Sequence, residues 1–143
     1  MAKNNGLNQW SLTLLRVVLG VIFLYHGYLK LFAPGGFTGT VGFLTALKIP
    51  LPHYAALFIS LVEFVGGILL LIGLLTRGAS VLLFIEMLVA FFKVHIKLGL
   101  VISQQAYGYE FIMLILAVLV VIMANGPGRF SIGKMLFRKK SLH

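Results

Sequence analysis

The sequence contains no cysteine, and its 143 residues include only three acidic side chains, all of them glutamate. Without thiols the chain can form neither disulfides nor thiolate metal sites, and dithiol redox chemistry is excluded. Charged residues make up 10% of the chain, whereas a soluble domain carries roughly a quarter. This shortage of charge argues against a soluble globular protein.

Hydrophobic residues account for 60% of the sequence, and the mean hydropathy is +1.05. Four long apolar segments are predicted to be helices, at about residues 11–32, 54–75, 79–96 and 106–124. At 1.5 Å per residue the second segment would measure about 33 Å, enough to cross the hydrocarbon core of a bilayer. The composition and these lengths predict an all-α membrane protein: a single-domain bundle of four transmembrane helices.

A shorter apolar pattern lies between the first two spans, in residues 37–47. Apolar side chains recur there every three or four positions, but the segment is too short to cross a bilayer. It is therefore predicted to be an interfacial or re-entrant helix. Pro50 and Pro52 stop it, and Pro52 suits the first turn of the next span.

The net charge of +9 could indicate a nucleic-acid partner, but no basic groove with interleaved aromatic residues is present. The cations flank the apolar spans instead. With four spans, seven of them lie on the side of the termini: Lys3, Arg77, Arg129, Lys134, Arg138, Lys139 and Lys140. Four lie on the other side: Lys30, Lys48, Lys93 and Lys97. This asymmetry, which includes the basic tail at 130–143, predicts cytoplasmic termini.

Glu63 stands near the middle of the second span, where a charge costs at least a few kcal/mol of insertion energy. Ser60, Glu63 and Gly67 share one helix face, which is expected to point into the bundle. Glu63 needs a partner or a proton there. A proton relay, formed with His26 and Glu110 toward the outer side, and a purely structural role both stay open.

Arg16, Gly20, Gly27 and Lys30 fall on one stripe of the first span, with Lys30 near enough to its end to reach the interface. Arg16 is deeper and is expected to pair with Glu86 or, second, with Glu63. Contact with a substrate is the alternative. The residues proposed to bind a substrate are Arg16, Lys30, Gly66, Gly67, Glu86 and His95.

No metal site is predicted. His26 and His95 could in principle hold a haem between helices, but nothing in the sequence requires one. A di-iron site needs Glu-x-x-His pairs, and none of the three glutamates has one. Gly66 and Gly67, beside Glu63, are expected to leave room for a flat ring.

Several of these features together resemble the DoxX family of small bacterial membrane proteins. They are Arg16 with Leu19–Gly20, His26–Gly27, Lys30–Leu31–Phe32, Pro50 and Pro52, Glu63 with Gly66–Gly67, Leu74–Leu75–Thr76–Arg77 and Gly126–Pro127–Gly128–Arg129. The resemblance implies a four-helix fold in the bacterial inner membrane and an oxidoreductase role. Its members are associated with quinone-linked sulfur oxidation and with redox partners.

The chain has no dinucleotide or phosphate loop, so a flavin or similar cofactor would have to come from a soluble or membrane partner. A quinone is then the expected substrate. A carrier for a small lipophilic molecule and a non-catalytic scaffold remain alternatives, and homo-oligomers are left open. A redox subunit predicts a quinone-sized cavity at Glu63, a carrier predicts openings to both faces, and a scaffold predicts a filled bundle.

Overall fold

The computed structural model describes residues 5–97, 99–100, 109–133 and 135. These residues form five α-helices and one 3-10 helix, in the order α1 Asn5–Phe32, α2 Gly36–Ala46, α3 Pro52–Ile72, α4 Thr76–Lys93, η1 His95–Lys97 and α5 Glu110–Asn125. The all-α fold class is confirmed. The predicted start of the fourth span at 106–108, most of the 98–104 loop and the tail beyond Met135 lie outside the described residues.

Three of the described helices, α1, α3 and α4, are long and apolar enough to cross a membrane, and α5 is a shorter apolar helix. Large apolar side chains stay exposed along these helices, among them Leu14, Val21, Phe58 and Leu114. A soluble monomer rarely exposes so much contiguous apolar surface. These faces therefore contact the lipid bilayer.

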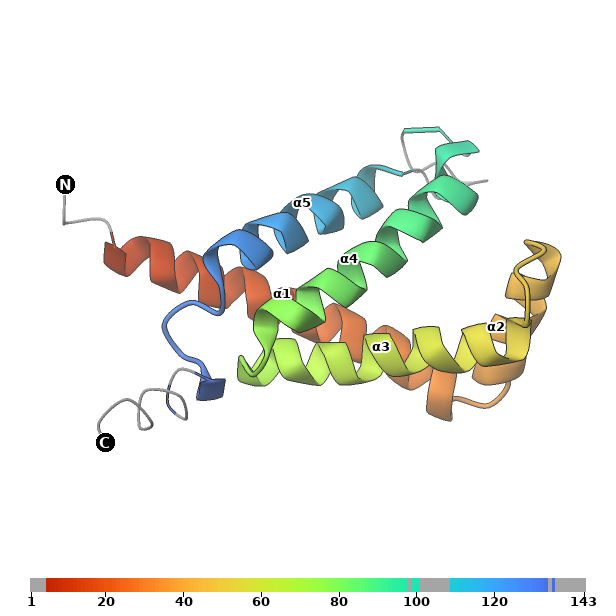
Figure 1. Ribbon diagram of the computed structural model, residues 1–143, viewed down its shortest axis with the longest axis horizontal. Helices are drawn as coiled ribbons and strands as arrows, with labels where there is room; N and C mark the ends of the chain where they lie inside the picture. The colour runs from red at the N-terminus through yellow and green to blue at the C-terminus, as the bar shows by residue number, and fades with distance from the viewer. Residues whose placement is uncertain (1–4, 98, 101–108, 134, 136–143) are drawn as a thin grey trace.

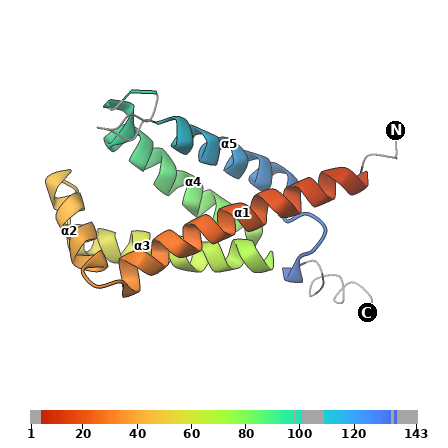
Figure 2. The same ribbon diagram turned by 180° about the vertical axis from the view of Figure 1, so that it is seen from behind.

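The helices pack as two antiparallel pairs, α1 with α3 and α4 with α5 (Figure 1). The core between the pairs is built from side chains such as Phe23, Leu70, Leu83 and Leu119. The short helix α2 packs against the first half of α3 at one end of the bundle (Figure 2). At the other end the start of α1 meets the segment that follows α5, and the Trp10 and Phe130 rings lie 5.0 Å apart.

Glycines set the register between α1 and α3. A Cβ on Gly67 would collide with the backbone of Leu24, and one on Gly27 would collide with the backbone of Phe64. Such close approach of two helix backbones is possible only with small residues. This register places the last turn of α1, with Lys30, beside the middle of α3. It also places Arg16 beside the end of α3, at Gly73.

Gly67→Ala is expected to destabilise the protein by about 2 kcal/mol, because the backbone of α1 cannot yield to the added methyl group. Gly78 is the matched control, since it is also helical and has nothing within 4 Å of its Cβ position. Gly78→Ala is expected to be neutral or to stabilise slightly. Thermal unfolding of the detergent-solubilised variants measures both effects. Equal stability of the two variants would contradict the glycine-set register.

The ends of α3 follow local sequence signals, but the predicted connection between α3 and α4 needs a correction. Pro52 begins α3, as predicted, and Gly73 ends it at a φ of 71°, which favours glycine. The tight connection to α4, predicted at 76–78, is instead residues 73–75, and Thr76 already begins α4. The reason is that the glycine C-cap stops α3 three residues earlier than the end of its apolar run.

Candidate functional site

A buried ion pair joins the first and third helices. The Lys30 ammonium lies 2.5 Å from Oε2 of Glu63. The Glu63 side chain is only 4% exposed and the Lys30 side chain 27% exposed. Glu63 therefore points into the bundle, as its helix face predicts, and its partner comes from the last turn of α1.

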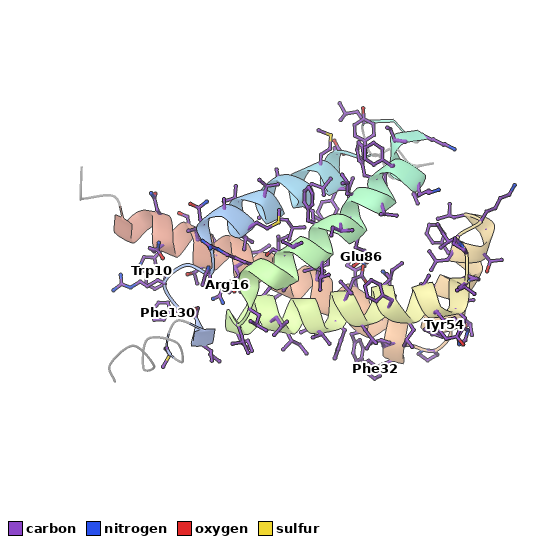
Figure 3. The ribbon with its side chains drawn as sticks, viewed as in Figure 1. Trp10, Arg16, Phe32, Tyr54, Glu86 and Phe130 are labelled. Atoms are coloured by element: carbon purple, nitrogen blue, oxygen red, sulfur yellow. The ribbon has the colours of Figure 1, made fainter. Side chains whose placement is uncertain are left out.

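Glu86 joins this pair from α4. Its carboxyl group lies within hydrogen-bonding reach of the Glu63 carboxyl and within electrostatic reach of Lys30. In Figure 3 Glu86 lies on the side of α4 that faces α3. The three side chains, Lys30, Glu63 and Glu86, are called the carboxylate cluster below. It gathers residues of three different helices near the middle of α3 and of α4.

The charges of the carboxylate cluster define what it can do. Two carboxyl groups that share a hydrogen bond need one proton between them, and two carboxylates in contact at low dielectric repel strongly. Lys30 compensates the other negative charge. Gain or loss of one proton thus changes the net charge of a site held inside the membrane, which is the chemistry that a proton relay requires. Glu86 is half-buried and Lys30 is partly exposed, so part of the carboxylate cluster is accessible from the surface of the protein.

Arg16 does not belong to this cluster, and its expected pairing with Glu86 or Glu63 is wrong. Its Nη2 donates a 2.5 Å hydrogen bond to the backbone carbonyl of Phe130. Because fourteen residues separate Arg16 from Lys30 along α1, the two lie about 21 Å apart along the helix axis. The α1–α3 register places Arg16 at the end of the bundle, beside Gly73.

Gly66 and Gly67 bring helices together and leave no room for a ring, contrary to expectation. A Cβ on Gly67 would meet the backbone of Leu24, and one on Gly66 would lie 3.2 Å from the side chain of Leu83. The space beside both glycines is occupied by α1 and α4.

The remaining predicted site residues are not members of the carboxylate cluster, although His26 is one helical turn before Lys30 on α1. His26 is exposed on α1, with its ring centroid 6.3 Å from that of Tyr25. Glu110 is exposed at the first residue of α5. His95 is half-buried in η1 beyond the end of α4. The structure therefore brings together Lys30, Glu63 and Glu86, whereas His26 is exposed on α1 and Glu110 and His95 belong to α5 and η1.

Within the described ranges, no group of three or more histidine and acidic side chains is placed to hold a metal ion.

Two features of the charged residues were not predicted from the sequence. The sequence interpretation placed Lys30 at the interface, although the stripe shared with Gly20 and Gly27 could have shown that Lys30 faces α3. It also missed that Arg16 binds a backbone carbonyl, a partner that carries no side-chain signal.

Fold and site together define a polytopic α-helical membrane protein with an ion pair and a second carboxyl group buried between its helices. The DoxX family model matches residues 11–96, which is more than half of the chain, and the chain belongs to the DoxX family. The expectation drawn from the sequence motifs is thereby confirmed.

Three relatives from different organisms are similar to this chain. "Putative oxidoreductase CatD" of Bacillus subtilis is 38% identical over 84 residues, which is 59% of this chain and 59% of that protein. An uncharacterised protein of Haemophilus influenzae is 32% identical over 132 residues, covering 91% of this chain and 93% of its own. The membrane protein Rv3486 of Mycobacterium tuberculosis is 29% identical over 137 residues, covering 90% and 83%. No solved structure matches the chain.

Proposed function

We propose that this protein is the membrane subunit of an oxidoreductase that passes electrons to the quinone pool. The observation that carries the proposal is the carboxylate cluster, an intramembrane Lys30–Glu63 pair with Glu86 in contact. A relative named as an oxidoreductase supports the same reaction class. Acidic groups within membrane spans are costly and are typical of proton pathways.

Reduction of a quinone to a quinol consumes two electrons and two protons. In the proposal the electrons come from a partner protein that carries a flavin or another redox cofactor. The carboxylate cluster delivers protons toward the quinone oxygens, with Glu63 and Glu86 exchanging the proton they share. Lys30 keeps the remaining carboxylate compensated, so each transfer changes the charge of the site by one unit. A quinone dissolved in the lipid approaches through the partly exposed side of the cluster, at Lys30.

Photolabelling tests where the quinone binds. A photoreactive azido-quinone added to the purified chain in lipid nanodiscs is expected to label α1, α3 or α4 within a turn of Lys30, Glu63 or Glu86. Unlabelled decylubiquinone should compete with it. Labelling spread evenly over the lipid-facing surface, with no competition, would favour the scaffold. Competed labelling that lies only away from the carboxylate cluster would favour the carrier.

We also propose that the termini face the cytoplasm of a bacterial cell and that the membrane is the inner one. Among described cations, Arg77 and Arg129 lie at the end of the bundle where α1 begins, whereas Lys93 and Lys97 lie at the opposite end. Reporter fusions after Lys140 and within 98–104 check this orientation. An active cytoplasmic reporter is expected only after Lys140, and the reverse pattern would contradict cytoplasmic termini.

A further inference from the structure

A second site lies at the end of the bundle where the start of α1, the end of α3 and residues 129–135 come together. The structure has a cleft of about 690 Å³ there. This volume is within the range of small-molecule sites, roughly 300–1,000 Å³. Its wall is largely apolar and includes Val17, Leu71, Ile72, Ile132 and Met135.

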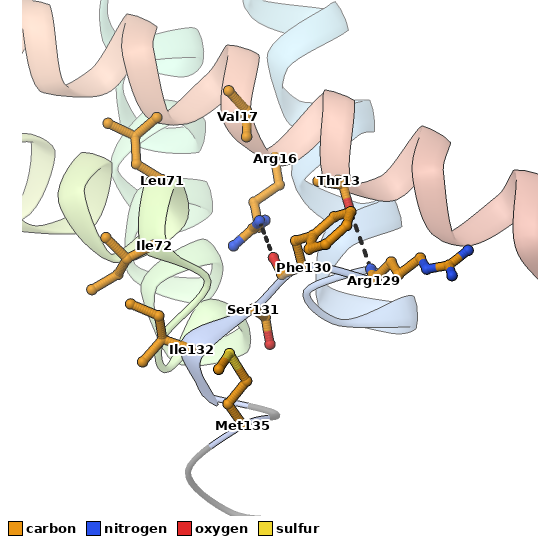
Figure 4. Close-up of a pocket in the computed structure, with 10 residues that line it drawn as sticks. All are labelled: Thr13, Arg16, Val17, Leu71, Ile72, Arg129, Phe130, Ser131, Ile132 and Met135. Carbon is orange, nitrogen blue, oxygen red and sulfur yellow. Dashed lines mark hydrogen bonds between the residues drawn. The ribbon is translucent and has the colours of Figure 1, made fainter.

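Arg16 reaches into this cleft. Figure 4 shows its side chain extending from α1 toward the space between Ile72 and Phe130. The residue is only 2% exposed, and its Nε and Nη1 have no hydrogen-bond partner among the residues that the structure describes. Only Nη2 is used, by the Phe130 carbonyl. A buried guanidinium with donors left over is costly unless an acceptor meets it.

A second arginine, Arg129, also borders the cleft, and in Figure 4 its side chain extends away from Arg16. It lies 5.8 Å from the ring centroid of Trp10. Its backbone N–H donates to the Thr13 hydroxyl at 3.0 Å, which fixes this segment against α1. Among the described residues that line the cleft there is no glutamate. The described lining therefore includes two arginines and no glutamate, and it favours an anionic ligand.

The surroundings favour an anion attached to an apolar tail. Trp10 and Phe130 make an edge-on aromatic contact, and both are exposed. Aromatic and basic side chains at the end of membrane helices are typical of the level of the lipid headgroups. Ile132 and Met135 are exposed apolar residues at the same cleft, where an acyl chain could pack.

We propose that this cleft binds the phosphate group of an anionic phospholipid, with Arg16 donating to its oxygens and Arg129 adding positive charge at the edge of the cleft. The arginine fork suits a phosphate because it can donate two parallel hydrogen bonds. The apolar wall accommodates the start of an acyl chain. This site is about 21 Å along α1 from Lys30, and it does not depend on the quinone-linked function proposed above.

Native mass spectrometry of the purified full chain in detergent tests this assignment. Dioleoyl phosphatidylglycerol is titrated against dioleoyl phosphatidylcholine, and inorganic phosphate is added as a competitor. Wild type is expected to retain one phosphatidylglycerol in preference to phosphatidylcholine. Arg16→Gln should weaken this binding about tenfold or more, the loss expected for hydrogen bonds to a charged group.

Arg129→Gln covers the case in which Arg16→Gln does not fold, because the Arg129 side chain is exposed. It should weaken binding several-fold. Arg77→Gln is the matched control: Arg77 is exposed, lies at the same end of the bundle and hydrogen-bonds the Ala124 carbonyl at 3.2 Å. It removes one charge outside the cleft and should change affinity by less than about twofold.

Three results would overturn the proposal. One is equal binding of the two lipids by wild type. The second is an equal loss in Arg129→Gln and Arg77→Gln, which would indicate general surface charge. The third is binding of inorganic phosphate as tight as that of phosphatidylglycerol and lost in the Arg16 or Arg129 variant, which would assign the cleft to a soluble anion instead of a lipid.

Discussion

Lys30→Leu is expected to destabilise the protein by about 3 kcal/mol or more. The substitution leaves Glu63 and Glu86 in contact inside the bundle without their cation, and loss of one partner of a buried ion pair typically costs about 3–5 kcal/mol. Thermal or denaturant unfolding in detergent measures the effect. Lys93→Leu is the matched control, since Lys93 is an exposed lysine in the last turn of α4. It should change stability by no more than about 1 kcal/mol.

The double variant Lys30→Leu with Glu63→Leu separates the ion pair from other effects of Lys30. Removal of both charges eliminates the uncompensated carboxylate, so the double variant should be more stable than Lys30→Leu alone. The coupling energy is expected to exceed about 1 kcal/mol. Additive single and double effects would show that the two side chains do not interact in the folded protein.

The helices could be predicted from the sequence because each depends on local information. The apolar runs have the length of a bilayer, and Pro52 marks the start of α3. The inward face of Glu63 also followed from local spacing, since a mid-span carboxyl flanked by small residues is expected to avoid lipid. Glu63 is 3% exposed, in agreement.

The partners of the charged groups could not be predicted because they depend on the register between helices. The close contacts at Gly27 and Gly67 fix the register of α1 against α3. In this register Lys30 lies at Glu63, and Arg16 lies away from it. A helical stripe specifies which face a residue occupies but not its height against a neighbouring helix. The Arg16–Phe130 contact joins residues 114 positions apart through a backbone carbonyl, which no sequence pattern marks.

Glu63→Gln separates the proton-handling role of Glu63 from its structural role. Glutamine keeps the shape of the side chain and removes its ionisation. The substitution leaves Lys30 without its partner, but the Lys30 side chain is already 27% exposed and lies near the end of α1. Glu86 also remains within electrostatic reach of the Lys30 ammonium. Glu63→Gln is therefore expected to cost less stability than Lys30→Leu.

Glu63→Gln is expected to lower the rate of the proposed reaction much more strongly than it lowers stability. Loss of a positioned proton-transfer group typically slows a reaction about 100- to 10,000-fold. Glu110→Gln is the matched control, because it removes one carboxylate of the same kind at an exposed position at the start of α5, outside the carboxylate cluster. Glu110→Gln should retain at least about half of the quinone-reduction rate that depends on this protein.

The most direct test is the rate at which the quinone pool becomes reduced in intact bacterial cells that supply the native partners. The quinol fraction is followed by extraction and mass spectrometry, and the rate in cells lacking the chain is subtracted. Each rate is normalised to the amount of folded protein in the membrane. The account predicts that Glu63→Gln lowers the normalised rate at least about 100-fold while Glu110→Gln leaves it nearly unchanged. A Glu63→Gln protein that reduces the pool as fast as wild type would contradict the account.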